Sequence, residues 1–89
     1  MHAIARFSIP LGEAGGFRAQ LEELRSVLAE APGFIDGVIG QNLDDPTLWH
    51  ISTNWENVGS YRRALSSTRA KLEAIPLLAR AIDEPGAYE

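Results

Sequence analysis

The chain has 89 residues, 45% of them hydrophobic and 22% charged, with a formal net charge of −4 and no cysteine. This composition fits one small folded domain, the acidic balance lacks the dense basic face that nucleic-acid binding needs, and the absence of cysteine excludes disulfides and thiolate metal sites. No apolar run approaches the length of a membrane span, and the N-terminal residues alternate in polarity instead of resembling a signal peptide, so we expect a cytoplasmic protein with no membrane partner.

The first third of the chain predicts a strand followed by a helix. Apolar and polar residues alternate over residues 2–9, which is typical of a half-buried strand. Residues 10–16 are expected to form a loop. From about Phe17 the apolar spacing becomes helical, and residues 31–33 end the helix. The side chains expected on the buried stripe of this helix are Phe17, Leu21, Leu24 and Leu28.

The middle of the chain predicts a hairpin of two antiparallel strands. Residues 34–43 form its first strand, in which Gly37 and Gly40 indicate a bulge or a close approach of another group. Residues 44–47 predict a turn, because Pro46 fixes φ and the neighbouring aspartates can accept hydrogen bonds from nearby backbone amides. Residues 48–56 form the second strand, with bulky side chains on both faces.

The last third predicts an interrupted helix and a short final strand. Asn57 or Ser60 can cap a helix at its start. Residues 66–68 interrupt this helix, and Pro76 suits the first turn of another short one. Residues 83–86 read as a loop, and residues 87–89 begin a fourth strand. The apolar stripe expected on the first of these helices is Val58, Tyr61 and Leu65.

The element order β-α-β-β-α-β predicts an α+β fold with a ferredoxin-like, split βαβ arrangement and an antiparallel sheet. Residues 1–89 are expected to form a single domain, since no linker or repeat interrupts them. A sheet of this kind carries its helices on one face, which leaves the other to be covered. A small domain also gains stability by burying one more face, so we expect a homodimer formed through the sheet.

Four segments together resemble one known family: "APGF" at 31–34, "DDPTLWHISTNWEN" at 44–57, "YRRALSS" at 61–67 and "PLLARAIDEPGAYE" at the end of the chain. Their order and spacing are similar to those of the antibiotic biosynthesis monooxygenase (ABM) domain family, within the dimeric α+β barrel superfamily. The resemblance implies a dimeric barrel and an apolar pocket between sheet and helices. Some members oxidise polycyclic aromatic molecules with oxygen and without metal or flavin, so the resemblance also implies an oxidoreductase with no cofactor.

The same resemblance singles out Trp55 and Tyr61 as candidate catalytic residues, because cofactor-free monooxygenases carry a tryptophan and a tyrosine at this spacing. A phenolic or quinone-type ligand would be held there, and its anion stabilised. The alternative is that the two aromatics only pack the helix onto the sheet, as buried aromatics commonly do in small cores. Further residues expected to line the pocket or the core are Phe7, Phe34, Trp49, Leu65, Ile75 and Leu78.

His50 and Asn54 are further candidates for binding the substrate. A histidine can accept a proton near neutral pH, and an asparagine amide can stabilise an oxyanion. Strand alternation, however, aims both away from the face that carries Trp55. The alternative is therefore a polar patch on the outer face of the sheet.

Two departures from the family pattern argue against particular activities of the family, oxygenation and haem degradation. Active oxygenases place an asparagine four residues before the tryptophan, and Ile51 stands at that position here. The haem-degrading members use a histidine ligand on the second helix, whereas His2 and His50 both lie on strands. No metal-ligand spacing is present. Three interpretations remain: an oxygenase, a non-enzymatic binding module, or a dimerisation domain with a filled core. An open cavity with a polar group would favour the first two.

Overall fold

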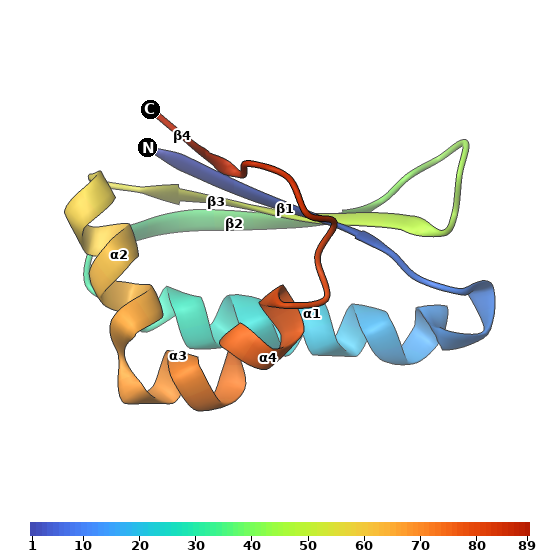
Figure 1. Ribbon diagram of the computed structural model, residues 1–89, viewed down its shortest axis with the longest axis horizontal. Helices are drawn as coiled ribbons and strands as arrows, with labels where there is room; N and C mark the ends of the chain where they lie inside the picture. Colours follow the sequence, from blue (N-terminus) through green and yellow to red (C-terminus); the bar gives the residue numbers. More distant parts are fainter.

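The computed structural model describes residues 1–89 and has two layers, a four-stranded antiparallel sheet and a layer of helices on one face of it (Figure 1). The strands lie in the order β2-β3-β1-β4. This is the predicted ferredoxin-like arrangement, so the fold class is confirmed. In chain order the elements are β1 (His2–Ser8), the 3-10 turn η1 (Leu11–Glu13), α1 (Ala14–Ala29), β2 (Phe34–Gln41), β3 (Leu48–Trp55), α2 (Val58–Ser66), α3 (Thr68–Glu73), α4 (Ile75–Leu78) and β4 (Ala87–Tyr88).

The first helix begins earlier than its apolar spacing predicts. Residues 10–16 form a 3-10 turn and the first turn of α1 instead of a loop. The apolar stripe starts only at Phe17 because Gly15 and Gly16, which precede it in α1, have no side chain and Ala14 has only a methyl group. The predicted stripe itself is confirmed, since Phe17, Leu21, Leu24 and Leu28 are all buried.

The hairpin of β2 and β3 follows the predicted strands and turn. In the turn, Asn42 accepts hydrogen bonds from the amides of Asp44 and Asp45, and Asp45 accepts one from the amide of Thr47. The role of Asn42 was not predicted. Residues 34–36 carry a register shift, so the bulge lies before the two glycines of β2. A Cβ at Gly40 would lie 2.6 Å from Nε2 of His50, so that glycine marks a close approach.

The helix after β3 is divided as predicted, but a different face is buried. Asn57 caps α2 through a hydrogen bond from the amide of Ser60, 2.8 Å long. Ser67 ends α2 and caps α3. The fully buried residues of α2 are Ser60 and Ala64, whereas Val58, Tyr61 and Leu65 are only half-buried. The predicted apolar stripe of α2 therefore lies at the border of the core, because small side chains bring the helix closest to the rest of the molecule.

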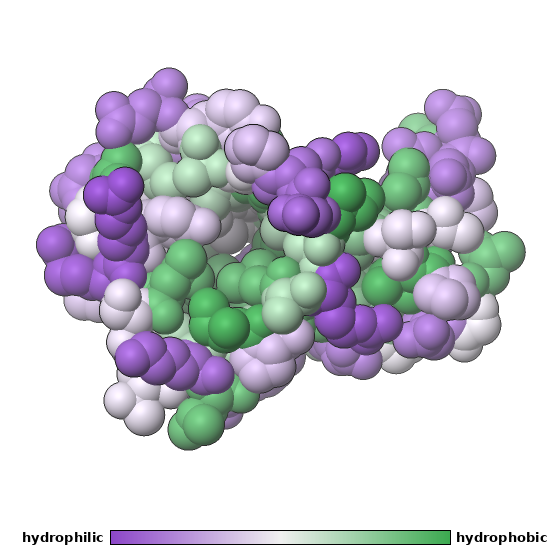
Figure 2. Space-filling model, viewed as in Figure 1, coloured by the Kyte–Doolittle hydropathy of each residue, from purple (hydrophilic) through white to green (hydrophobic).

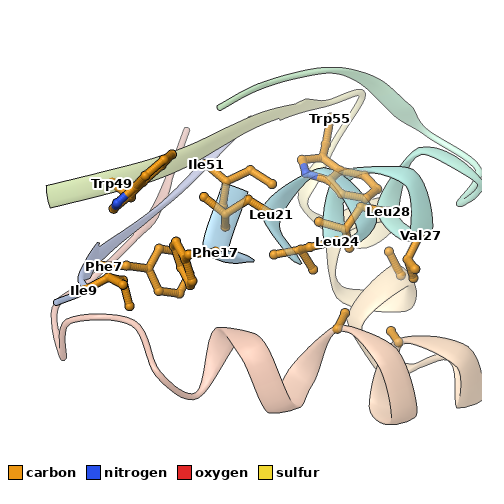
Figure 3. Packing of buried hydrophobic residues seen from close by; sticks show 13 residues of the cluster. Phe7, Ile9, Phe17, Leu21, Leu24, Val27, Leu28, Trp49, Ile51 and Trp55 are labelled. Carbon is orange, nitrogen blue, oxygen red and sulfur yellow. The ribbon is translucent and has the colours of Figure 1, made fainter. Parts of the chain in front are cut away.

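The core lies between the sheet and the helices (Figure 3). The inner faces of β1 and β3 supply Phe7, Trp49, Ile51 and Trp55, and α1 covers them with its buried stripe. Phe7 and Phe17 meet edge to face with ring centroids 5.1 Å apart, and Phe17 meets Trp49 at 5.8 Å. Such pairs add to the stability that aromatic burial already provides.

The C-terminal segment returns to the sheet within the same chain. Residues 82–86, which we call the strap, lead into β4, and β4 pairs with β1 beside the N-terminus (Figure 1). The Ile82 amide donates to the Arg6 carbonyl, and the Ile4 amide donates to the Gly86 carbonyl. This pairing confirms a fourth strand and places it at the edge of its own sheet.

Candidate functional site

An open cavity of about 320 Å³ lies between the inner face of the sheet, the helices and the strap. Figure 2 shows a hollow between the two layers, with hydrophobic residues gathered around it. Its volume lies at the lower end of the range typical of small-molecule sites. The sheet wall consists of Ala3, Ala5, Ile51 and Thr53, and the helix wall includes Leu28, Tyr61, Leu65, Ile75 and Leu78.

Three other hollows are larger, with volumes of about 340, 390 and 470 Å³. One, of about 390 Å³, lies beside α2 and α3, where Arg69 is paired with Glu30 and Glu73. Another, of about 470 Å³, is lined mostly by exposed polar and charged residues of α1, α3 and the segment after α4, namely Gln20, Glu23, Glu73 and Arg80. Only the cavity under the sheet reaches the buried side chains of β3, so it is the site in which a small apolar molecule would lose most of its contact with water.

Tyr61 lines this cavity and stands on the first turn of α2, next to Trp55. The two ring centroids are 5.7 Å apart and meet at 61°, an edge-to-face contact. Tyr61 also borders a second hollow of about 340 Å³ at the chain termini. Its hydroxyl has no hydrogen-bond partner in the chain, and burial raises the pKa of this hydroxyl above the ordinary tyrosine value. The group is therefore a neutral donor at physiological pH.

Trp55 lies behind this wall and not in it. The side chain is 1% exposed and packs edge to face against Phe34, with centroids 5.3 Å apart. The indole nitrogen donates to Oγ1 of Thr53 over 2.9 Å. Trp55 therefore touches Tyr61 and Thr53, two residues that do line the cavity, but does not line it itself.

The remaining predicted pocket residues divide between the cavity and the core. Leu65, Ile75 and Leu78 line the cavity. Phe7 and Trp49 lie in the part of the core beside Phe17, away from the cavity, and Phe34 packs on Trp55. The indole nitrogen of Trp49 is buried without an acceptor.

His50 and Asn54 lie on the outer face of the sheet, as strand alternation predicts, and do not reach the cavity. Nδ1 of His50 is 2.9 Å from Oγ of Ser52. Asn54 joins a row across three strands, in which it contacts Nδ1 of His2 and donates to Oδ1 of Asp36. No three acidic or histidine side chains come together as a metal site.

Several wall residues were missed by sequence reasoning, notably Ala3, Ala5 and Thr53. Both alanines lie on the inner face of β1, and the feature that distinguishes them is their small size. It is the signal that could have revealed the site, because small side chains opposite a helix leave a space that the helix does not fill. Thr53 lies on the inner face of β3, between two larger inward residues, Ile51 and Trp55.

The strap closes one side of the cavity and is held there by an ion pair. The guanidinium of Arg6 binds the Glu84 carboxylate through two hydrogen bonds of 2.6 and 2.8 Å. Hydrogen bonding from Arg6 lowers the pKa of Glu84, and the hydrogen bond to Glu84 raises the pKa of Arg6. Both residues line the cavity, so this pair lies at its border.

Acid should loosen the strap. The pKa of Glu84 is lower in the folded protein, so the contribution of the pair is present above the ordinary carboxyl pKa and is lost as the pH falls through the lowered value. We therefore expect Glu84→Gln to speed hydrogen exchange at the Ile4 and Ile82 amides at neutral pH, and to change little in acid. Glu73→Gln, which alters a carboxylate of α3, is the control. Equal exchange in wild type and Glu84→Gln at neutral pH would contradict this role.

The fold and the cavity define a class of protein: small ferredoxin-like α+β domains with a mostly apolar cavity between sheet and helices. The chain matches the family described as antibiotic biosynthesis monooxygenase over residues 1–72 and belongs to that family. No curated protein matches it. No helix is long and apolar enough to cross a membrane.

Solved structures agree with this fold. The chain is 21% identical to SnoaB, a cofactor-independent oxygenase from Streptomyces nogalater, with a TM-score of 0.79 and coverage of 99% of this chain and 92% of that one. It is also 21% identical to a conserved protein from Methanosarcina mazei Go1, with a TM-score of 0.76 and coverage of 97% and 84%. At this level of identity the likeness establishes the fold alone.

Proposed function

We propose that the protein is a cofactor-independent monooxygenase that binds a small phenolic or quinone-type aromatic molecule in the cavity under the sheet. The observation that carries this proposal is the Tyr61 hydroxyl, a half-buried donor without a partner on the wall of an otherwise apolar cavity. A planar aromatic molecule would be held by the apolar walls, and the hydroxyl would bind its oxygen.

The chemistry needs no external reductant for a suitable substrate. An ionised hydroxyanthrone is electron-rich enough to react with oxygen directly. One oxygen atom becomes the new carbonyl oxygen at the ring CH₂, and the other leaves as water with the two hydrogens lost from that carbon. Tyr61 would donate a hydrogen bond to the substrate anion, and the cavity would hold it in one orientation. Trp55 would act as a positioning residue for Tyr61 through their edge-to-face contact.

Oxygen consumption with 1,8-dihydroxyanthrone tests this proposal, in buffer free of flavin and containing a chelator. We expect uptake above the spontaneous rate, and a loss of about tenfold or more in Tyr61→Phe, because one anion-stabilising donor is removed. The stability of Tyr61→Phe should change by less than about 1 kcal/mol, since its hydroxyl has no partner to lose. Tyr88→Phe is the matched control, because it removes the exposed hydroxyl of β4. Unchanged uptake in Tyr61→Phe would contradict the proposed role.

A non-enzymatic binding protein is the second candidate. It is favoured by the lack of a free general base in the cavity, because Glu84 is paired with Arg6 and His50 lies on the opposite face of the sheet. Ile51 also stands where the resemblance leads one to expect an asparagine. Tight binding of the anthrone without oxygen uptake would decide for this candidate.

We also propose that the outer face of the sheet pairs with that of a second copy to form a homodimer. Ile4 and Val38 lie in one row across this face and are 38% and 56% exposed, beside polar side chains that already pair with one another. An apolar row on the open face of a sheet is a surface that a second copy of the chain could cover.

Val38→Asp should separate the dimer into monomers, because it would bury a charge on each side of the proposed interface. Sedimentation velocity gives the mass directly. Leu72→Asp is the control, since Leu72 is 73% exposed on α3, in the helix layer. A Val38→Asp protein that still sediments as a dimer would rule out this face.

A further inference from the structure

Thr53 supplies the only buried polar side chain in the wall of the cavity. It lies on the inner face of β3 and is 4% exposed. Of the four polar residues in the wall, Arg6 and Glu84 bind one another at the border. The hydroxyls of Thr53 and Tyr61 are therefore the groups that a ligand inside the cavity could use.

The two hydrogen bonds of the Thr53 hydroxyl differ in length. Its Oγ1 accepts a hydrogen bond of 2.9 Å from the buried indole nitrogen of Trp55, which fixes one side of the hydroxyl. Its own hydrogen points toward the carbonyl oxygen of Ala3 over 3.4 Å, which is longer than the usual O–H···O distance of about 2.5–3.0 Å. The Thr53 hydroxyl thus accepts one hydrogen bond of normal length and donates only a long, weak one.

We infer that Thr53, oriented by Trp55, donates its hydrogen to a carbonyl or phenolate oxygen of the bound aromatic molecule. A hydroxyl that already accepts from an N–H is a better donor for a second partner, because hydrogen bonds in a chain polarise one another. The inference rests on the proposed binding of an aromatic ligand and deepens it: the site selects molecules with an acceptor oxygen over plain hydrocarbons of the same shape.

This assignment gives Trp55 a defined role. It does not touch the ligand, because it lies behind the wall. It is a positioning residue that acts on the ligand through Thr53, in addition to its contact with Tyr61. A purely structural tryptophan would affect the affinity for all ligands of the cavity alike, whereas this role predicts an effect confined to ligands with an acceptor oxygen.

The test uses two planar probes of nearly equal shape, 9-fluorenone with a carbonyl and fluorene with a CH₂ in its place. Dissociation constants are measured by NMR titration of the full-length protein. Wild type should prefer fluorenone, and Thr53→Val, which keeps the shape but removes the hydroxyl, should weaken fluorenone binding about fivefold and leave fluorene unchanged. Thr53→Ser should keep the preference. Trp55→Phe should reduce it in the same selective manner.

The outcomes separate this inference from the proposed function. If wild type binds fluorenone and fluorene equally, or if Thr53→Val keeps the full preference, the assignment of Thr53 is wrong while aromatic binding in the cavity stands. If wild type binds neither probe, the cavity does not take aromatic molecules, and the proposed function fails together with the inference. A selective loss in Thr53→Val that Thr53→Ser restores would establish it.

Discussion

Gly33→Ala is expected to lower the free energy of unfolding by about 3 kcal/mol, the largest loss that we predict for a single methyl group. Gly33 follows α1 with φ of +91°, a conformation that costs little for glycine and is strained for any other residue. A Cβ there would also overlap Oγ and Cβ of Ser60, which is buried on α2. The strain cannot relax without moving α2 off the core.

Chemical denaturation at equilibrium measures this loss, and Gly16→Ala is its matched control. Gly16 lies in the first turn of α1, and a Cβ there would meet nothing within 4 Å. Alanine should therefore raise stability at that site, by on the order of 0.5 kcal/mol, because it favours the helix. Two substitutions of the same kind should then differ in sign. A Gly33→Ala protein as stable as wild type would mean that the junction of α1 and β2 is looser than described.

Ala5→Phe is expected to abolish ligand binding without loss of stability. Ala5 lies on the inner face of β1, in the wall of the cavity of about 320 Å³, so an added ring would occupy the space proposed for the ligand. Burial of the new ring is favourable, because it fills an existing void instead of displacing packed side chains. The affinity for 9-fluorenone should fall by at least about tenfold, which corresponds to a loss of about 1.4 kcal/mol.

Leu43→Phe is the control for this variant. Leu43 is fully exposed in the turn of the hairpin, so the new ring could bind aromatic molecules only by stacking at the surface. NMR titration should give the wild-type affinity for Leu43→Phe. Undiminished binding by Ala5→Phe would place the ligand outside the cavity.

The fold could be predicted from the sequence because local patterns and tertiary packing agree in this chain. Alternation in β1 and β3 assigned each side chain to its face, and Asn57, one of the two caps that the sequence offered, is the residue that caps α2. The inner aromatics Phe7, Trp49 and Trp55 were recognised as part of one layer. Prediction failed at the start of α1, where Gly12, Gly15 and Gly16 are typical of a loop but the chain forms a 3-10 turn and a helical turn.

The site was predicted less completely, for a physical reason. A cavity depends on the distance between two layers, which no periodicity encodes, so the place of Trp55 behind the wall and of Thr53 in it could not be read from spacing. The pattern that identified Trp55 and Tyr61 as neighbours was sufficient for their contact, but not for deciding which of them faces the ligand.

The most direct test of the central claim is to locate a bound planar phenol by intermolecular nuclear Overhauser effects. With 1-naphthol, we expect contacts between its ring protons and the side chains of Ala5, Leu65 and Ile75, which come from three different elements and meet only at the cavity. Contacts confined to exposed groups such as Leu43 or Leu72, or none at all, would contradict the claim that this cavity is the binding site.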